Sequence, residues 1–134
     1  WDIKLEGYGA LMGELNSMIG IRQLEDLESL LKKQRANALI WDKNILGDKS
    51  IEALTPIEKS MPNRWVYGVM AKNKIETIIE FRKKGFYATS VHINNNIYSI
   101  FDNTTNLSGV NEFMCHYVAL PCGWWLTIKD ELNG

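Results

Sequence analysis

Apolar residues recur every three or four positions through the first third of the chain, which is the spacing of a helix with one apolar side. This pattern predicts a helix over residues 9–20, ending at Gly20, and a second helix over residues 22–35. A short apolar run at residues 38–41 fits either a strand or a buried turn. Residues 45–63 are interrupted by two prolines, and they predict one or two short helices.

The middle of the chain has the clearest local signals. Residues 64–70 are rich in aromatic and β-branched side chains and predict a strand. Asn73 and Glu76 have the spacing of a helix-capping pair, so a helix is expected to begin directly after Asn73. Gly85 follows three basic residues, which favour the C-terminal end of a helix, and it predicts where this helix ends.

The last third of the chain predicts strands. Residues 85–102 form two strand-like runs joined by an asparagine turn at residues 94–96, because asparagine tolerates a positive φ. Two more strands are expected over residues 115–120 and 124–128. The predicted fold class is therefore α+β, with N-terminal helices packed on a C-terminal antiparallel sheet in a single domain spanning residues 1–134.

Composition narrows the possible functions. The net charge of −1 argues against a nucleic-acid partner, and no apolar run reaches the length of a membrane span. Cys115 and Cys122 could close a small loop by a disulfide, but two reduced thiols are favoured, and a cytoplasmic location is favoured over secretion. With only two histidines, no metal site is expected. The chain begins at Trp1 rather than at methionine, so we expect a fragment or a processed product.

Three stretches together resemble a degenerate papain-like cysteine peptidase. The two strand-like runs ending in Asp102 keep the spacing of the histidine and acid in papain-like enzymes. Residues 21–27 resemble a helix of picornavirus leader proteinases, which are papain-like. Tyr8 and Gly9 resemble the pair that replaces the cysteine in peptidase-like domains of haemolysin transporters. The resemblance implies an α+β fold that is papain-like in outline.

The resemblance also implies a site. Tyr8 or Ala10 would occupy the nucleophile position, Tyr87 the histidine position, and Asp102 would be the retained acid. A tyrosine, with a usual pKa near 10, is a poor base at neutral pH, so the site is expected to be inactive. His92 is an alternative base, although the predicted hairpin register separates it from Asp102 by roughly 13 Å.

The expected function is therefore that of a protein- or peptide-binding domain without peptidase activity and without a cofactor. Its candidate anchors are four tryptophans, since tryptophan is enriched at interface hot spots: Trp41, Trp65, Trp124 and Trp125. One alternative is an active papain-like cysteine peptidase or deamidase of a virus or bacterium, whose cysteine is substituted or lies outside the fragment. Another is a small bacterial immunity or inhibitor protein. The oligomeric state stays open.

Overall fold

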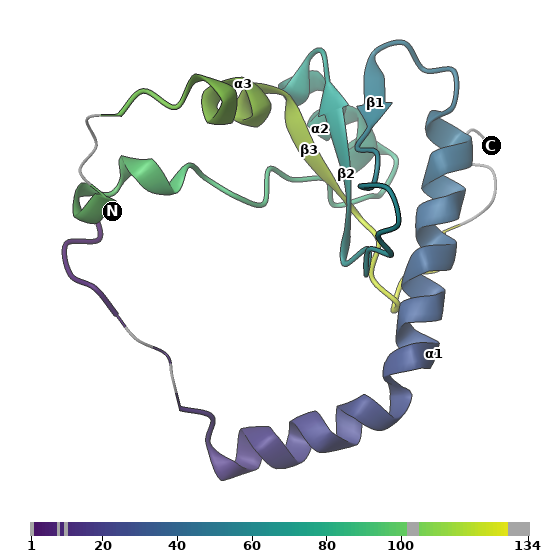
Figure 1. Ribbon diagram of the computed structural model, residues 1–134. Coiled ribbons are helices and arrows are strands. Elements are labelled where there is room, and N and C mark those ends of the chain that lie inside the picture. Colours follow the sequence, from purple (N-terminus) through teal and green to yellow (C-terminus); the bar gives the residue numbers. More distant parts are fainter. Residues whose placement is uncertain (1, 8, 10, 102–104, 129–134) are drawn as a thin grey trace.

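The computed structural model describes residues 2–7, 9, 11–101 and 105–128, and in these residues it contains three α-helices and one three-stranded sheet (Figure 1). The helices and strands follow one another as α1 (Glu14–Ile45), β1 (Ile51–Ala53), β2 (Val66–Ala71), α2 (Lys74–Lys83), α3 (Ser108–His116) and β3 (Tyr117–Pro121). Two short 3₁₀ turns, Asn95–Ile97 and Ser99–Phe101, precede α3. The predicted α+β class is confirmed.

The sheet has the order β1-β2-β3, and both neighbouring pairs are antiparallel. Its register places Val69 of β2 opposite Val118 of β3, and Tyr67 opposite Leu120. Alternate residues of β2 are buried, which gives the sheet one face packed against the core. The second half of α1 and helix α2 cover this face, whereas Phe113 of α3 stacks on Tyr117 of β3 at 5.0 Å.

Trp41 is the centre of the core. Its side chain is completely buried, and its ring contacts Phe81 of α2 edge-to-face at 5.5 Å and Phe86 at 5.0 Å. The indole N–H donates a 2.9 Å hydrogen bond to the carbonyl of Pro121, so its polar atom is satisfied inside the core. One residue of α1 thereby connects this helix with α2, with the chain that follows α2, and with the end of β3.

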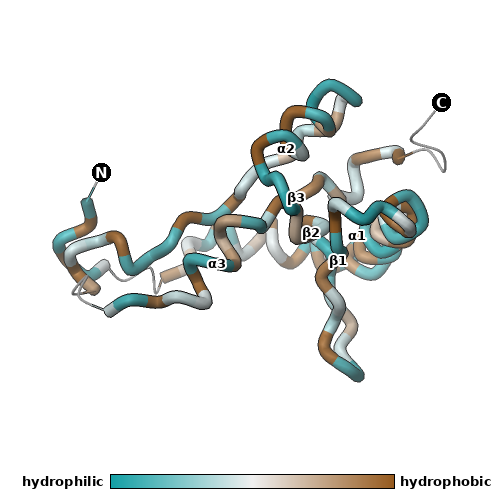
Figure 2. The backbone as a smooth tube through the Cα atoms, turned by 90° about the horizontal axis from the view of Figure 1, so that it is seen from above, coloured by the Kyte–Doolittle hydropathy of each residue, from teal (hydrophilic) through white to brown (hydrophobic). Residues whose placement is uncertain are grey.

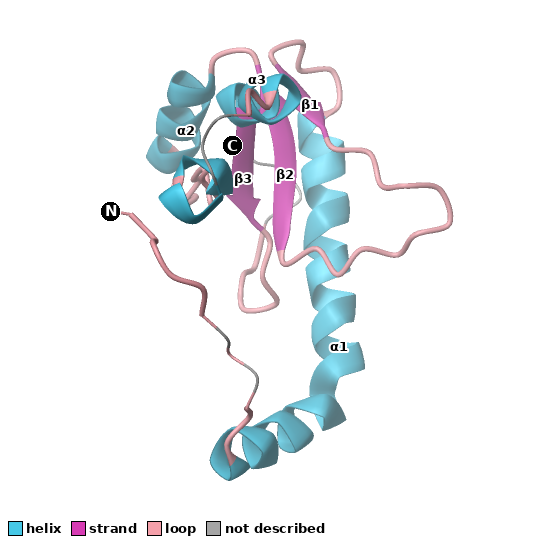
Figure 3. Ribbon diagram, turned by 60° about the vertical axis from the view of Figure 1, so that its left-hand side comes forward, coloured by secondary structure: helices cyan, strands magenta, loops and turns pink. Residues whose placement is uncertain are grey.

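Helix α1 changes direction part-way along its length, and its first half extends beyond the sheet (Figures 1 and 3). The buried residues of α1 all lie between Gln34 and Ile45. The hydroxyl of Ser29 donates to the carbonyl of Asp26 within the same helix at 3.0 Å. Such back-bonding bends helices, and here it lies near the boundary between the exposed and the packed half.

The predictions for the first 63 residues were partly wrong. The two expected helices are one continuous helix, because Gly20 costs a helix only about 1 kcal/mol and does not end it. Residues 38–41 belong to α1 rather than to a strand or turn. Residues 45–63 contain the end of α1, strand β1 and a loop instead of short helices.

The middle of the chain was predicted well. The strand expected at residues 64–70 is β2, and the helix expected after Asn73 is α2. The Asn73 side chain accepts a hydrogen bond from the backbone N–H of Glu76, as the capping pair predicts. Gly85 has a φ of +88°, a conformation that glycine adopts without strain, and it ends the helix as expected.

The strands expected in the last third are mostly absent from the described residues. Residues 86–101 form no hairpin, and only Thr89 makes an isolated bridge, to Ala119. Cys115 and His116 end α3 instead of starting a strand, although β3 follows directly. Residues 124–128 form a turn and an irregular stretch.

The segment expected to be a hairpin pairs with distant parts of the chain. The N–H and the hydroxyl of Ser99 both donate to the carboxylate of Asp2, each at 2.9 Å, and the N–H of Ile100 donates to Ile3. Asn94 donates to the side chain of Asn111 in α3 at 2.8 Å. The described residues 2–7, 9 and 11–13 are here called the N-terminal arm, and the contacts of Asp2 and Ile3 hold its start against residues 99–100, on the far side of the molecule from α1 and α2 (Figure 2).

Candidate functional site

Three of the predicted catalytic positions, Tyr8, Ala10 and Asp102, lie outside the described residues. Tyr87, at the expected histidine position, is 74% exposed, and the guanidinium of Arg82 lies over its ring at 4.8 Å from the centroid. This tyrosine is therefore a surface residue that makes a cation–π contact.

His92, the alternative base, is exposed in the irregular segment that replaces the predicted hairpin. Its ring lies 6.1 Å from that of Trp65, which precedes β2. The register argument that separated His92 from the acid does not apply, because the hairpin does not exist. The structure therefore places His92 beside the exposed indole of Trp65.

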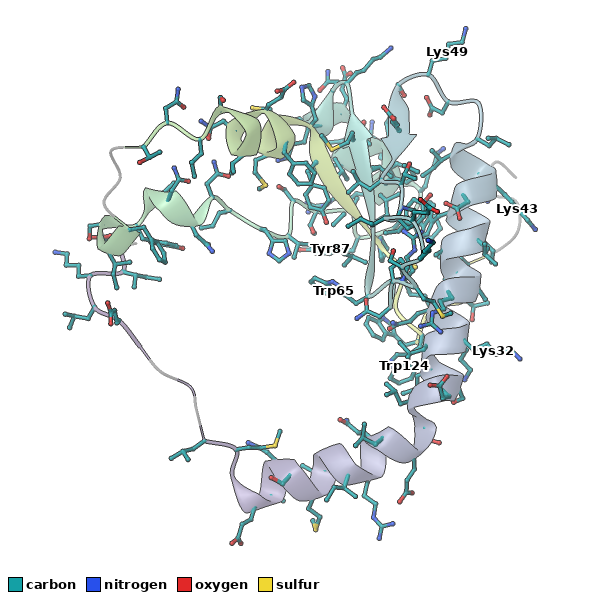
Figure 4. The ribbon with its side chains drawn as sticks, in the orientation of Figure 1. Lys32, Lys43, Lys49, Trp65, Tyr87 and Trp124 are labelled. Carbon is teal, nitrogen blue, oxygen red and sulfur yellow. The ribbon has the colours of Figure 1, made fainter. Side chains whose placement is uncertain are left out.

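The four tryptophans fall into two groups. Trp41 is buried in the core, so it was wrongly predicted as an anchor for a partner. Trp65, Trp124 and Trp125 are 52%, 43% and 66% exposed, and their role as anchors stays a prediction. Trp65 and Trp124 lie, with Tyr87, on the side of the molecule that faces the N-terminal arm and the first half of α1 (Figure 4). The labelled lysines, Lys32, Lys43 and Lys49, project from the opposite, outer side.

A cavity of about 280 Å³ lies where the end of α1 meets β1 and α2. Its floor is apolar and aromatic, with Trp41 and Phe81, and its rim carries Asp48 and Lys84. Hydrogen bonds from the hydroxyl and the N–H of Ser50, with nearby Lys84 and Lys72 adding to them, hold the pKa of the Asp48 carboxyl below its usual value. This arrangement favours a fixed carboxylate at the rim.

The two cysteines are free thiols, Cys115 exposed and Cys122 buried. Burial raises the pKa of Cys122 to about 11, and its thiol donates to the carbonyl of Gln34 at 3.4 Å, so it is a protonated core residue rather than a nucleophile. Within the described ranges, no group of histidines, cysteines and carboxylates could hold a metal ion. In the part of the chain that the structure describes, no helix has the length and apolar character needed to cross a bilayer.

Comparison with known proteins decides the family. The family model of the DegT/DnrJ/EryC1/StrS aminotransferases matches residues 2–131, almost the entire chain. The chain belongs to this aminotransferase family. The match covers the arm, the whole of α1 and the sheet, so it does not depend on one local motif.

Individual relatives agree with this result. The chain is 24% identical over 140 residues to a UDP-4-amino-4,6-dideoxy-N-acetyl-beta-L-altrosamine transaminase of Helicobacter pylori, covering 98% of this chain and 37% of that protein. The sugar aminotransferase CalS13 of Micromonospora echinospora has 27% identity and a TM-score of 0.80, with 92% of this chain and 34% of CalS13 covered. AtS13 of Actinomadura melliaura has 29% identity and a TM-score of 0.79, with 96% and 35% covered. The chain thus spans about a third of the length of these relatives.

Membership of the aminotransferase family corrects the functional predictions. The papain-like resemblance was wrong, and so were the inactive-peptidase, active-peptidase, deamidase and immunity-protein interpretations built on or beside it. The short motifs that carried the resemblance were too small to identify a family, and the hairpin that joined them is not formed. The helical pattern of residues 14–45 could have predicted α1 as one long helix, if Gly20 had not been taken as its end.

Aminotransferases of this family depend on pyridoxal phosphate (PLP). A PLP site requires a lysine that forms a Schiff base, together with donors for the phosphate. Among the described lysines, only Lys74 is partly buried, and its ammonium already donates to the carbonyl of Met114. The cavity beside Lys84 presents the fixed carboxylate of Asp48, which would repel a phosphate. Among the described residues, neither the surroundings of Lys74 nor the cavity at Lys84 therefore fits the cofactor.

Proposed function

We propose that this chain forms about one third of a sugar aminotransferase subunit, and that the complete subunit transfers an amino group from an amino acid to a keto sugar carried on a nucleotide. The observation that carries this proposal is the family match along residues 2–131. The relative from Helicobacter pylori is named as a transaminase of a UDP-linked sugar, which supports a nucleotide-linked substrate.

The described residues of this chain contribute to the reaction by supporting and positioning surface side chains, rather than by holding the cofactor. Because neither Lys74 nor Lys84 lies in a site that fits the cofactor, we assign the PLP-binding lysine to the part of the subunit beyond the described residues. The packed core around Trp41 holds β2 in place, and β2 in turn positions Trp65 and the neighbouring His92 at the surface. An exposed indole beside an imidazole can pack against a sugar or base and donate a hydrogen bond to it.

The test uses the complete subunit that carries this chain. It is incubated with PLP, an amino acid donor and a panel of nucleotide-linked keto sugars, and the products are analysed by mass spectrometry. We expect one sugar nucleotide to gain an amino group in place of its keto oxygen, while the donor becomes a keto acid. The proposal fails if no sugar in the panel is aminated by a subunit that binds PLP.

The 134-residue chain provides the control for this experiment. On its own it is expected neither to bind PLP, measured by the absorbance of the cofactor, nor to form product. PLP bound by the isolated chain through a lysine would contradict the division of roles proposed above.

A further inference from the structure

The backbone takes an unusual conformation immediately before the exposed Trp65. Arg64 has a φ of +58°, in the left-handed region that residues other than glycine rarely adopt. Its guanidinium turns back over the ring of Tyr67 in β2, at 5.6 Å from the centroid. Strained residues of this kind persist only where surrounding contacts hold them, and they are concentrated at binding and catalytic sites. The conformation of Arg64 therefore points to a function for the side chain that follows it.

Hydrogen bonds on both sides of this arginine hold its conformation. The amide of Gln34, a side chain of α1 that is only 8% exposed, donates to the carbonyl of Asn63 at 2.8 Å. The Nε of Arg35 donates to the carbonyl of Pro62 at 3.3 Å. The Asn63 side chain in turn accepts a hydrogen bond from the backbone N–H of Trp65 at 3.2 Å. This short segment is thus fixed to the packed half of α1, and the fixed part ends at the tryptophan.

The side chain that these contacts position is an open aromatic surface. Trp65 is 52% exposed, and its ring lies 6.1 Å from the imidazole of His92, tilted by 59° (Figure 4 shows Trp65). An indole whose backbone is already fixed loses little conformational freedom when a flat ligand packs on it. Of the parts of a nucleotide-linked sugar, the base is the planar one, and every base has a face that stacks on an aromatic ring. The polar groups at the edge of a base can exchange a hydrogen bond with an imidazole.

We propose that Trp65 is the surface on which the base of the nucleotide-linked substrate stacks, with His92 at the edge of the base. Gln34, Asn63 and Arg64 are positioning residues that hold the indole in place. This inference rests on the proposed function in taking a nucleotide-linked sugar as the substrate. A base bound away from the reacting carbon is held equally in the ground state and in the transition state, so the contact lowers KM and leaves kcat unchanged.

The test measures the affinity of the complete, PLP-loaded subunit for UDP, dTDP and GDP by isothermal titration calorimetry, with a hexose phosphate as the ligand without a base. Trp65→Ala is expected to weaken binding of the preferred nucleotide by roughly 10-fold or more, because it removes the stacking surface. Binding of the hexose phosphate should be unchanged. The KM of the sugar nucleotide should rise while kcat stays the same. The matched control is Ile57→Ala, an 83% exposed side chain of the same loop between β1 and β2, which should change none of these values.

Gln34→Leu tests the positioning role, because it removes the donor to Asn63 and keeps a side chain of similar size. It is expected to weaken nucleotide binding by roughly 3-fold when Trp65 is present. In the Trp65→Ala background it should have no further effect, whereas general damage to the structure would weaken both backgrounds equally and overturn the positioning role. Asn63→Ala provides the same comparison from an exposed position, in case the buried substitution prevents folding.

Three outcomes would overturn the stacking site. The first is an equal loss of affinity for the hexose phosphate, which would mean that the sugar rather than the base packs on the indole. The second is a Trp65→Ala subunit that melts at a lower temperature but binds nucleotides normally, which would make the indole a packing residue. The third is a subunit that binds none of the nucleotides. A subunit that binds nucleotides through Trp65 but aminates no sugar overturns the proposed function and leaves the stacking site standing.

Discussion

The two halves of α1 belong to one continuous helix, yet they differ in almost every contact they make. The second half contributes Trp41 to the core and donates hydrogen bonds from Gln34 to Asn63 at 2.8 Å and from Asn37 to Gly123 at 3.0 Å. The polar contacts of the first half stay within the helix, such as the exposed ion pair between Arg22 and Glu25 at 3.3 Å. Exposed ion pairs of this kind contribute little to stability.

The difference teaches that a helical pattern identifies an element without identifying its partner. Both halves carry apolar side chains, and both belong to the same α-helix. Only the second half has the strands and α2 within reach, because those elements follow it in the sequence and fold back onto it. For the first half, the described residues supply no comparable cover, so its apolar side chains are exposed.

The largest expected effect comes from removing the central side chain of the packed half. Trp41→Ala deletes a buried indole, its edge-to-face contacts and its hydrogen bond to Pro121, so we expect a loss of about 3–5 kcal/mol of unfolding free energy. The measurement is chemical denaturation of the 134-residue chain. Leu24→Ala, in the exposed half, is the matched substitution and should change the free energy by less than about 0.5 kcal/mol. Equal losses in the two variants would contradict the division of α1 into two halves.

A smaller effect is expected from ionising Cys122, whose thiol contacts Gln34 in the packed half. Burial raises the pKa of Cys122 to about 11 in the folded chain, whereas an unfolded cysteine ionises near 8.5. The unfolded state therefore releases its proton first, and stability is fully present below about pH 8.5 and falls as the pH rises toward 11. By pH 10 the loss should be on the order of 1–2 kcal/mol.

This pH dependence is measured by denaturant titrations between pH 8 and 10, below the usual pKa of tyrosine. Cys122→Ala should flatten the dependence, and Cys115→Ala should leave it unchanged, since Cys115 is exposed on α3. A dependence that persists in Cys122→Ala would assign it to another group.

The sequence predicted those elements whose signals are local. The capping pair and the terminal glycine of α2 lie within or beside the helix, and the strand residues of β2 are adjacent to one another. The hairpin was wrong because the partners of that segment are distant: Ser99 bonds to Asp2, which is 97 positions away. The burial of Trp41 depends similarly on Pro121, 80 positions away. A pattern of neighbouring residues does not reveal which residue, 80 or more positions away, a side chain will contact.

The site was harder to predict than the fold. Tyr87 and His92 attracted a catalytic interpretation because they occupied fixed positions in an assumed hairpin, and that geometry does not exist. In addition, neither Lys74 nor Lys84 lies in a site that fits PLP, and no motif around the lysines of the chain pointed to the cofactor. Family membership came from similarity spread over the whole chain.

A more modest effect is expected where the packed half meets β2. The hydroxyl of Tyr67 donates to the carboxylate of Asp42 in α1, and burial raises the pKa of this tyrosine, with the Asp42 bond adding to the effect. Tyr67→Phe removes the bond but keeps the buried ring, so we expect a loss of about 1 kcal/mol, measured by denaturation. A loss as large as that of Trp41→Ala would mean that polar contacts, rather than apolar packing, hold α1 on the sheet.

The smallest effect concerns the arm that precedes the exposed half. Hydrogen bonds from the N–H and hydroxyl of Ser99 hold the pKa of Asp2 below its usual 3.8. Because the folded pKa is lowered, the contact contributes its full stabilisation when the pH is above the ordinary carboxyl pKa. That stabilisation is lost as the pH falls through the lowered pKa of the folded state. Asp2→Asn should therefore shift the amide resonance of Ser99 in NMR spectra at pH 7 and remove its change on acidification. Global stability should be unchanged within the error of a denaturation measurement, because the contact is exposed. A larger loss would show that the arm, and with it the exposed half of α1, is already part of the core that Trp41 organises.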